Sequence, residues 1–306
     1  MRVTITGATG LIGPRVVASL QARGDEVTVL TRDPERARER LPGIHEAAHW
    51  DLLDEPAPTA ALAGREVVVH LAGENVAQRW SANAKQAIRD SRVSGTKHLV
   101  QGLAALEQGE RPRTLVSSSA IGYYGAHGDE PIDEEVPAGD DFLARTCRDW
   151  ELEALEAEAL GMRVASVRTG VVLDRKGGAL GKMLPPFKLG VGGPVAGGHQ
   201  FVSWIHVEDL VGIALSAIDD ERWHGPINAT APEPQRNRDF SKALGRALHR
   251  PSLLPVPGAA LRALYGEMAE IVTSGARVLP AKALVLGYQF SYPQLDVALR
   301  STLDGD

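Results

Sequence analysis

The sequence Thr-Gly-Ala-Thr-Gly-Leu-Ile-Gly, residues 6–13, carries a Gly-x-x-Gly-x-x-Gly pattern between an apolar strand and a helix. Gly7 allows a tight turn, Gly10 lets backbone approach a pyrophosphate, and Gly13 lets the helix pack closely on the strand. The N–H groups at the start of that helix bind phosphate. We call residues 6–13 the glycine turn. The pattern predicts a dinucleotide site, with a purely structural turn as the alternative.

The end of the second expected strand indicates which dinucleotide is bound. Enzymes that use NAD place Asp or Glu there for the ribose 2′-hydroxyl, but this chain has Thr31 and Arg32, followed by Arg36 and Arg38. A guanidinium binds the 2′-phosphate of NADP through charge-assisted contacts. Asp33 keeps NAD open, and an Arg-rich solvated helix face is the structural alternative. The residues favour NADP (NADPH) over NAD.

Apolar runs alternate with longer helical patterns in the first half, which is typical of a parallel sheet with crossover helices. We therefore expect an α/β protein, a Rossmann doubly wound parallel sheet with a smaller C-terminal substrate-side domain. Residues 1–175 form the NADP-binding Rossmann domain, with 206–230 returning to it. Residues 176–205 and 231–306 form the family-specific domain. Residues 176–198 hold eight Gly and predict a long, loop-rich excursion.

The expected elements follow from hydrophobic periodicity and from turn residues. The expected strands are 3–6, 26–30, 67–71, 114–117, 163–168 and 225–229. The expected helices are 11–23, 83–106, 141–160, 206–218, 238–249, 258–270 and 295–303.

Composition excludes several classes of protein. The 306 residues include 33 Lys+Arg and 39 Asp+Glu, a net charge of −6, which argues against a nucleic-acid partner. No apolar run reaches the roughly 18 residues of a membrane span, and no signal-peptide pattern opens the chain. A single cysteine, Cys147, excludes an internal disulfide framework. We expect a cytoplasmic protein with a small-molecule substrate; the sequence does not indicate the oligomeric state.

A zinc-protease motif, His-Glu-x-x-His, occurs at residues 45–49. Zinc binding needs a helix that brings both histidines to one face. The fold predicts a strand here, and on a strand His45 and His49 would lie about 13 Å apart. We therefore expect no metal site.

The segment Ser-Ser-Ser-Ala-Ile-Gly-Tyr-Tyr-Gly, residues 117–125, ends another strand. Together with the glycine turn it resembles the extended short-chain dehydrogenase/reductase superfamily. The resemblance implies that Ser119, or failing that Ser118, is a catalytic serine that orients a substrate carbonyl or alcohol. Hydroxyls that cap a strand end are the structural alternative. We call residues 117–125 the serine turn.

The superfamily's Tyr-x-x-x-Lys dyad is missing. Leu143 stands at the Tyr position and Cys147 at the Lys position, and neither side chain can replace the dyad. An acid or base must therefore come from elsewhere, and Tyr123 and Tyr124 are the candidates because they adjoin the serine turn. A role in the core is the alternative for each tyrosine, and Cys147 fits a small buried residue better than a nucleophile.

The whole chain resembles one branch of that superfamily, the atypical "epimerase family protein" group with its own C-terminal domain. Stretches that carry the match include 71–75, 79–80, 168–173, 183–194, 197–201 and 287–293. Members also tend to lack the dyad and are expected to bind NADP. The positions implied for the cofactor are Gly7, Thr9, Gly10, Leu11, Ile12, Gly13, Thr31, Arg32, Asp51, Leu71, Ala72, Gly73, Arg92, Arg168, Gly170 and Val171.

The glycine-rich excursion is expected over the substrate, with Lys182, His199, Gln200, Trp204 and His206 on that side. A side chain that hydrogen-bonds at the start of a helix is the alternative for His206, and a structural charge at a strand end is the alternative for Arg168. The resemblance implies an NADP-dependent oxidoreductase or epimerase acting on a small polar or sugar-like substrate. The missing dyad keeps a second hypothesis open, a cofactor-binding sensor or scaffold without turnover.

Overall fold

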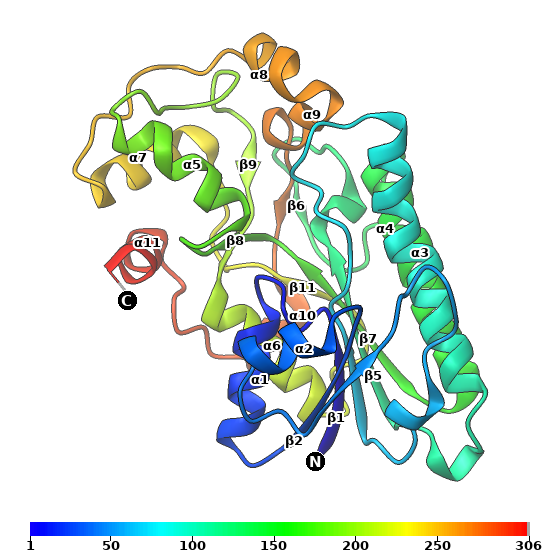
Figure 1. Ribbon diagram of the computed structural model, residues 1–306. Coiled ribbons are helices and arrows are strands. Elements are labelled where there is room, and N and C mark those ends of the chain that lie inside the picture. Colours follow the sequence, from blue (N-terminus) through cyan, green and yellow to red (C-terminus); the bar gives the residue numbers. More distant parts are fainter. Residues whose placement is uncertain (305–306) are drawn as a thin grey trace.

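The computed structural model describes residues 1–304 and has a seven-stranded parallel sheet at its centre (Figure 1). The strand order β11-β7-β5-β4-β1-β2-β3 reverses direction between β1 and β4, which is the Rossmann arrangement. The predicted fold class is therefore confirmed. The strands are β1 (Arg2–Thr6), β2 (Glu26–Thr31), β3 (Glu46–His49), β4 (Val67–His70), β5 (Thr114–Ala120), β7 (Arg163–Thr169) and β11 (Gly225–Ala229).

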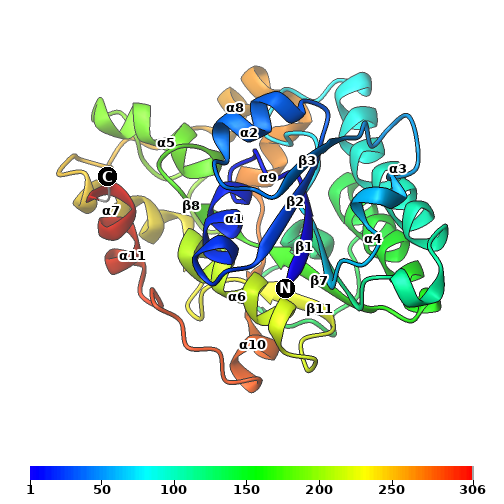
Figure 2. The same cartoon turned by 60° about the horizontal axis from the view of Figure 1, so that its bottom comes forward.

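Helices cover both faces of this sheet (Figure 2). One face packs on α1 (Gly13–Ala22) and α6 (Val207–Asp219), and the other packs on α3 (Ala82–Ala104) and α4 (Phe142–Leu155). The strands are buried on both sides, which explains their continuous Val-rich runs. The short α2 (Pro34–Arg40) follows β2. Four 3-10 turns join these elements: η1 (Thr59–Ala61), η2 (Gln108–Glu110), η3 (Ile121–Tyr124) and η4 (Glu156–Leu160).

A smaller unit extends beyond the carboxyl ends of the strands. Its core is made by Leu173, Leu184, Phe187, Trp204 and Phe240, which are buried together. Its elements are β8 (Val171–Leu173), α5 (Gly178–Lys188), β9 (Phe201–Val202), β10 (Trp204–His206), β12 (Gln235–Arg236), α7 (Asn237–Ala247), α8 (Gly258–Tyr265), η5 (Gly266–Met268), α9 (Ala269–Thr273) and α11 (Leu295–Asp304).

The prediction of a long, loop-rich excursion over residues 176–198 is wrong in its first half, because α5 lies there. Leu180, Leu184 and Phe187 repeat at helical spacing and bury one face of α5 in the core of the smaller unit. Pro185 and Pro186 fall inside this helix. The glycines and prolines of this segment conceal the helical spacing of its apolar residues. Packing against the core of the smaller unit makes the segment helical.

Other predicted elements are present with end shifts of up to three residues, apart from two helices that break. The expected helix 258–270 is interrupted at Gly266, whose φ of 64° is left-handed. The helix expected over 141–160 passes into η4 for its last turn. No helix among residues 1–304 is both long and apolar enough to cross a membrane.

The last part of the chain is joined to the Rossmann sheet region by buried contacts. The two-residue strands β6 (Pro131–Ile132) and β13 (Arg277–Val278) pair in parallel, and α10 (Ala281–Val285) follows. The buried Glu134 carboxylate accepts backbone N–H groups from Asn228 at 2.9 Å and from Lys282 at 3.2 Å. The predicted domain boundaries remain a prediction, although β11 does return to the sheet after the excursion.

Candidate functional site: the crevice at the carboxyl ends of the strands

The glycine turn has the shape that its sequence predicts. Gly7 has a φ of 66°, and a Cβ there would lie 2.6 Å from the backbone carbonyl carbon of Leu71. A Cβ on Gly13 would lie 2.4 Å from the backbone oxygen of Ala8, so helix and strand approach closely only with glycine. No side chain caps the first turn of α1. Arg15 and Val16 donate to the backbone oxygen of Ile12, and Pro14 has no N–H. Within residues 1–304 the N–H groups just before them, at residues 11–13, have no backbone acceptor and can bind an anion.

A buried histidine fixes the glycine turn to the end of β4. His70 Nδ1 lies 2.7 Å from Thr6 Oγ1, and His70 Nε2 lies 3.0 Å from Thr96 Oγ1. The backbone N–H of Ala72 also donates to Thr6 Oγ1. Burial lowers the pKa of His70 to about 4, so the ring is neutral at physiological pH. These bonds hold the glycine turn against the end of β4 in one geometry. We call the region beyond the carboxyl ends of β1, β2, β4 and β5 the crevice.

The end of β2 separates the two cofactor interpretations. The Asp33 carboxylate accepts the backbone N–H of Arg36 at 3.0 Å and so caps α2. Thr31 Oγ1 accepts the backbone N–H of Asp33. Arg32 is exposed, and within residues 1–304 its guanidinium has no hydrogen bond or ion pair. The acidic group is engaged, and the basic group is available for a phosphate.

Other positions implied for the cofactor lie in the glycine turn itself and just after β3 and β4. Gly10 is exposed, and Thr9, Leu11, Ile12, Asp51 and Leu71 are half-buried. Asp51 Oδ1 accepts the N–H of Leu53 in the turn after β3. A Cβ on Gly177 would lie 2.9 Å from Leu11 Cδ1, so the start of α5 lies against the glycine turn. An ion pair of 2.6 Å between Arg15 and the buried Asp174 supports this contact.

The serine turn places Ser119 against a buried ion pair. Its hydroxyl donates to Glu151 Oε1 at 2.6 Å, and Arg168 binds the same carboxylate through Nε and Nη2, both at 2.8 Å. Arg168 thus holds both carboxylate oxygens of Glu151 in a bidentate pair. The Ser119 proton is therefore directed at Glu151, and the side chain is buried, with 3% of the residue exposed. Ser118, on the opposite face of β5, is half-buried.

Arg168 and Tyr124 are buried in the core, which fits the structural alternative for each better than a cofactor contact or an acid/base role. Tyr124 is fully buried, donates to Asn228 Oδ1 at 2.7 Å and accepts from Arg168 Nη1 at 2.9 Å. Burial raises the pKa of Tyr124 to about 12, which does not suit an acid/base. Arg168 is 2% exposed. Tyr123 is half-buried, with its ring centroid 3.5 Å from the Arg168 Cζ.

The positions of the missing dyad face the serine turn. A Cβ on Gly122 would lie 3.4 Å from Leu143 Cβ and 4.0 Å from Cys147 Sγ. Burial raises the pKa of Cys147 to about 12, against the opposing charge of Arg92. The thiol is therefore neutral and buried, and it provides no base. Gly170 and Val171, at the end of β7, use their N–H groups on the backbone oxygens of Ala229 and Ser203.

The residues expected on the substrate side do not form one cluster. Trp204 is fully buried in the core of the smaller unit, and its Nε1 donates to the backbone oxygen of Glu233. His206 is 3% exposed, and its Nδ1 accepts the N–H of Glu208 at the start of α6. Both side chains are structural, as the alternative for His206 predicts. His199 is exposed, and Gln200 donates to the backbone oxygen of Val272.

A loop after β4, residues 74–81, connects the two units, and we call it the bridging loop. Lys182 Nζ donates to the backbone oxygen of Ala77, so α5 contacts this loop. Arg79 Nη1 donates to the backbone oxygens of Ala263 and Leu264 at the end of α8. Arg79 was not predicted as a functional residue, because long-range contacts to backbone oxygens have no signature in the sequence.

Glu151 is the other residue that sequence reasoning missed. It lies one helical turn after Cys147 on α4, on the same face, so its spacing would have placed it under the serine turn. Its partner Arg168 comes from β7, and no local pattern predicts that pairing.

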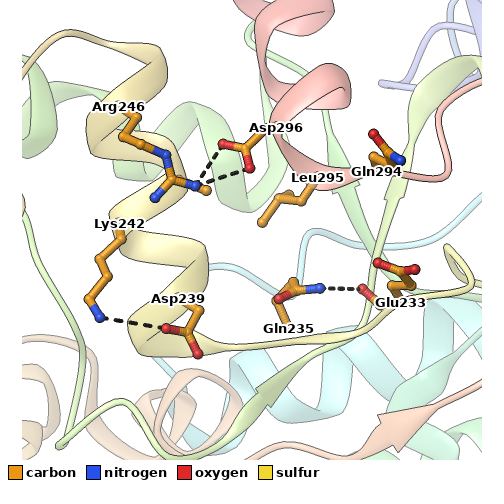
Figure 3. Close-up of a pocket in the computed structure, with 9 residues that line it drawn as sticks. Glu233, Gln235, Asp239, Lys242, Arg246, Gln294, Leu295 and Asp296 are labelled. Carbon is orange, nitrogen blue, oxygen red and sulfur yellow. Dashed lines mark hydrogen bonds and ion pairs between the residues drawn. The ribbon is translucent and has the colours of Figure 1, made fainter.

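A separate shallow pocket of about 380 Å³ lies between α7 and α11 (Figure 3). Arg246 pairs with Asp296 at 2.8 Å across it, and Lys242 lies 3.7 Å from Asp239. Four of its charged side chains are thus paired with one another. None of the residues implied for the cofactor lines it.

The histidines of the His-Glu-x-x-His motif are on or beside β3, as the strand prediction expects. Among residues 1–304 no group of three or more His, Cys, Asp or Glu side chains is arranged to hold a metal ion.

Fold and crevice together define a Rossmann protein built to bind a dinucleotide. Comparison with family models identifies residues 3–228 as "NAD dependent epimerase/dehydratase family" and residues 256–302 as "Domain of unknown function (DUF1731)". The chain therefore belongs to the NAD-dependent epimerase/dehydratase family.

Relatives match the chain along its whole length. The Arabidopsis thaliana protein named "Epimerase family protein SDR39U1 homolog, chloroplastic" is 41% identical over 99% of this chain and 87% of its own length. The Homo sapiens epimerase family protein SDR39U1 is 37% identical over 98% of this chain and 99% of its own. The resemblance to this group of epimerase family proteins is thus confirmed.

Solved structures agree. The crystal structure of human SDR39U1 isoform 2 with NADPH has a TM-score of 0.86 and 35% identity, and each chain is covered completely. A UDP-galactose 4-epimerase has a TM-score of 0.75 over 99% of this chain and 98% of its own, with 20% identity, which shows a common fold alone.

Proposed function

We propose that this protein binds NADPH in the crevice and supports hydride transfer to or from a small polar or sugar-like substrate. The observation that supports NADPH over NADH comes from the end of β2. There Asp33 caps a helix, while Arg32 has no partner within residues 1–304. The crystal structure of the human relative with NADPH supports the same choice.

Each half of the crevice has a role in this proposal. The glycine turn holds the pyrophosphate with backbone N–H groups, and Arg32 binds the 2′-phosphate of the adenosine. NADPH, when bound, supplies the hydride. Ser119 orients the substrate through its oxygen, because its proton is engaged by Glu151. Tyr123 and Ser118, both half-buried, are the nearby hydroxyls that remain as candidate proton donors.

A second candidate function is a cofactor-binding sensor without turnover. The observation that favours it is the neutral, apolar pair of Leu143 and Cys147 beside the serine turn. Hydride transfer to a carbonyl needs a proton for the developing alkoxide, and this pair supplies none.

A cytoplasmic location also remains a proposal, since the Arabidopsis relative is named chloroplastic.

Titration of NADPH and NADH by nicotinamide fluorescence tests the cofactor. Arg32→Ala should weaken NADPH binding about tenfold or more, the scale of one charge-assisted contact, and should leave NADH nearly unchanged. Arg2→Ala, a change at an exposed arginine on the opposite end of the neighbouring strand, is the matched control and should affect neither. Equal binding of both cofactors to the unaltered protein would refute the role of Arg32.

Turnover is tested separately. NADPH oxidation is followed with a panel of sugar nucleotides and small carbonyl compounds, and with NADP⁺ and the corresponding alcohols in the reverse direction. Turnover that falls in Ser119→Ala supports the enzyme. NADPH binding with no turnover across the panel favours the sensor.

A further inference from the structure

Exposed aliphatic side chains gather on two adjacent loops of the smaller unit, on the side away from the central sheet (Figure 1). The loop after α5 carries Leu189 and Val191, and the loop after α7 carries Leu253 and Leu254. Leu189 and Leu253 are 78% and 81% exposed, and the other two are about half exposed. We call these four residues the aliphatic face. A group of exposed apolar side chains marks a surface where a protein or a membrane binds, whereas single ones are ordinary.

Contacts between the two loops bring these side chains together. Arg250 Nε donates to the backbone oxygen of Lys188 at 3.0 Å, where both loops begin. Val195 and Val256 form a parallel β-bridge, where both loops end. The loops therefore run side by side in the same direction between these two contacts, and the four residues of the aliphatic face are neighbours.

The charge of these two segments differs from that of the rest of the chain. Residues 175–207 and 240–266, which include the loops, hold eight Lys or Arg and no Asp or Glu. The whole chain has a net charge of −6, so its acidic residues are concentrated elsewhere in the sequence. Basic segments in an acidic protein create a local positive potential, which attracts negatively charged surfaces.

Two side chains keep this positive charge beside the aliphatic face. Lys188 directly precedes the face in sequence and is exposed. Arg250 is also exposed, and its guanidinium donates to the backbone oxygens of Lys188 and His249, which leave its charge in place. Lys242 and Arg246 on α7 form ion pairs and contribute less. Lys188 and Arg250 are therefore the cations that flank the aliphatic face.

We propose that the aliphatic face docks on the surface of a membrane that contains anionic lipids. Its side chains enter the boundary between headgroups and acyl chains, while Lys188 and Arg250 contact the acidic groups of the lipids. Exposed side chains on loops fit a fluid lipid surface, which needs no complementary shape, and the excess of Lys and Arg selects anionic lipids. Docking of this kind needs no membrane-spanning helix, and it does not depend on NADPH in the crevice.

Co-sedimentation with vesicles tests the proposal. The full chain should bind vesicles of phosphatidylcholine that contain about 30% phosphatidylserine, and added salt should weaken this binding. Vesicles of phosphatidylcholine alone should bind the chain at least about tenfold more weakly, because they offer no negative surface.

Substitutions separate the apolar contribution from the charged one. Leu189→Ser combined with Leu253→Ser should lower the partition coefficient on the mixed vesicles about tenfold or more, because less apolar surface leaves water. Lys188→Gln should lower it about fivefold, the effect of one cation near an anionic surface. The matched controls are Val285→Ser, at an 86% exposed residue on α10, and Lys97→Gln, at an exposed lysine on α3. Neither control should change the partition coefficient.

All five substituted positions are exposed, so each variant should keep the thermal melt of the unaltered protein. Failure of the unaltered protein to sediment with the mixed vesicles at low salt would overturn the proposal. An unchanged partition coefficient in the double leucine variant would overturn it as well, because another surface would then bind the lipid. Self-association that the double variant abolishes, without any vesicle binding, would instead identify the aliphatic face as an interface between two copies of the chain.

Discussion

The glycine turn and the serine turn lie at the ends of strands of one sheet, yet they differ in what holds them. The glycine turn is fixed by backbone: a Cβ at Gly7 or Gly13 has no room. The serine turn is fixed by side chains, through Ser119, Glu151, Arg168 and Tyr124. Backbone contacts tolerate no substitution at these glycines, whereas a side-chain network can lose its reactive members and keep its structure.

This difference is consistent with the way the two halves of the crevice match the superfamily's sequence pattern to different degrees. The cofactor half retains every glycine that the pattern requires. The serine-turn half has Ser119 bound to the Glu151–Arg168 ion pair, and it has Leu143 and Cys147 where the superfamily resemblance places the dyad. At the serine turn, the residues that stabilise the structure are thus distinct from the dyad positions. At the glycine turn, the same glycines shape the backbone and leave room for the cofactor.

The largest effect should come from the ion pair under the serine turn. Glu151→Ala leaves the Arg168 charge, with 3% of its side chain exposed, without a partner, and should lower the free energy of unfolding by about 3–5 kcal/mol. Urea unfolding measures this loss. Asp239→Ala, which removes an exposed pair with Lys242, should cost less than about 1 kcal/mol. Equal costs would contradict the view that side chains hold the serine turn.

The second effect tests the backbone control of the glycine turn. Gly7→Ala should abolish NADPH binding and destabilise by about 3 kcal/mol, because the left-handed backbone is strained and Cβ meets Leu71. Gly24→Ala is the matched control: its φ is 83°, and a Cβ there meets no atom within 4 Å. It should cost about 1–2 kcal/mol from backbone strain alone and keep NADPH binding. Comparable binding loss in both variants would refute the steric argument.

The smallest effect is the pH response of the histidine beneath the glycine turn. Burial lowers the pKa of His70 to about 4, below its ordinary value of about 6.5, so the unfolded chain takes up the proton first. The contribution of neutral His70 to the free energy of unfolding is complete above pH 6.5 and is lost as the pH falls towards 4. Stability should decrease by about 2 kcal/mol between pH 7 and pH 5.

Denaturant unfolding of wild type and His70→Gln across this range isolates the contribution. The variant lacks the titrating ring, so its stability should fall by about 2 kcal/mol less than that of wild type over the same interval. Parallel curves for the two proteins would show that His70 does not carry the response.

Much of the fold follows from local sequence. The glycine turn, the Val-rich strands and helix periodicity predict the sheet and its flanking helices because each signal spans only a few residues. The identity of β11 as a sheet strand is also predicted. The prediction of a loop-rich excursion is wrong in the α5 region, because two prolines inside the helix conceal its apolar spacing. That spacing is made by Leu180, Leu184 and Phe187.

The candidate site can be predicted from the sequence only where the backbone and the strand ends set the positions of its residues. Gly7, Gly13 and Arg32 lie where the pattern predicts, since strand ends fix their positions. The burial of Trp204 and Arg168 depends on which distant elements cover them, and hydrophobicity or charge alone does not reveal it. The same holds for Glu151, whose partners come from β5 and β7, far from it along the chain.

The carboxylate of Glu134 has a consequence for modularity. It receives backbone N–H groups from Asn228 in the sheet and from Lys282 near the end of the chain. The region that matches the epimerase family ends at residue 228, so a cut there would remove the Lys282 donors and the β13 pairing and leave an acid half-satisfied in the interior. The two matched regions therefore share buried contacts, and exchanging either one would require a replacement for the contacts that the other makes with it.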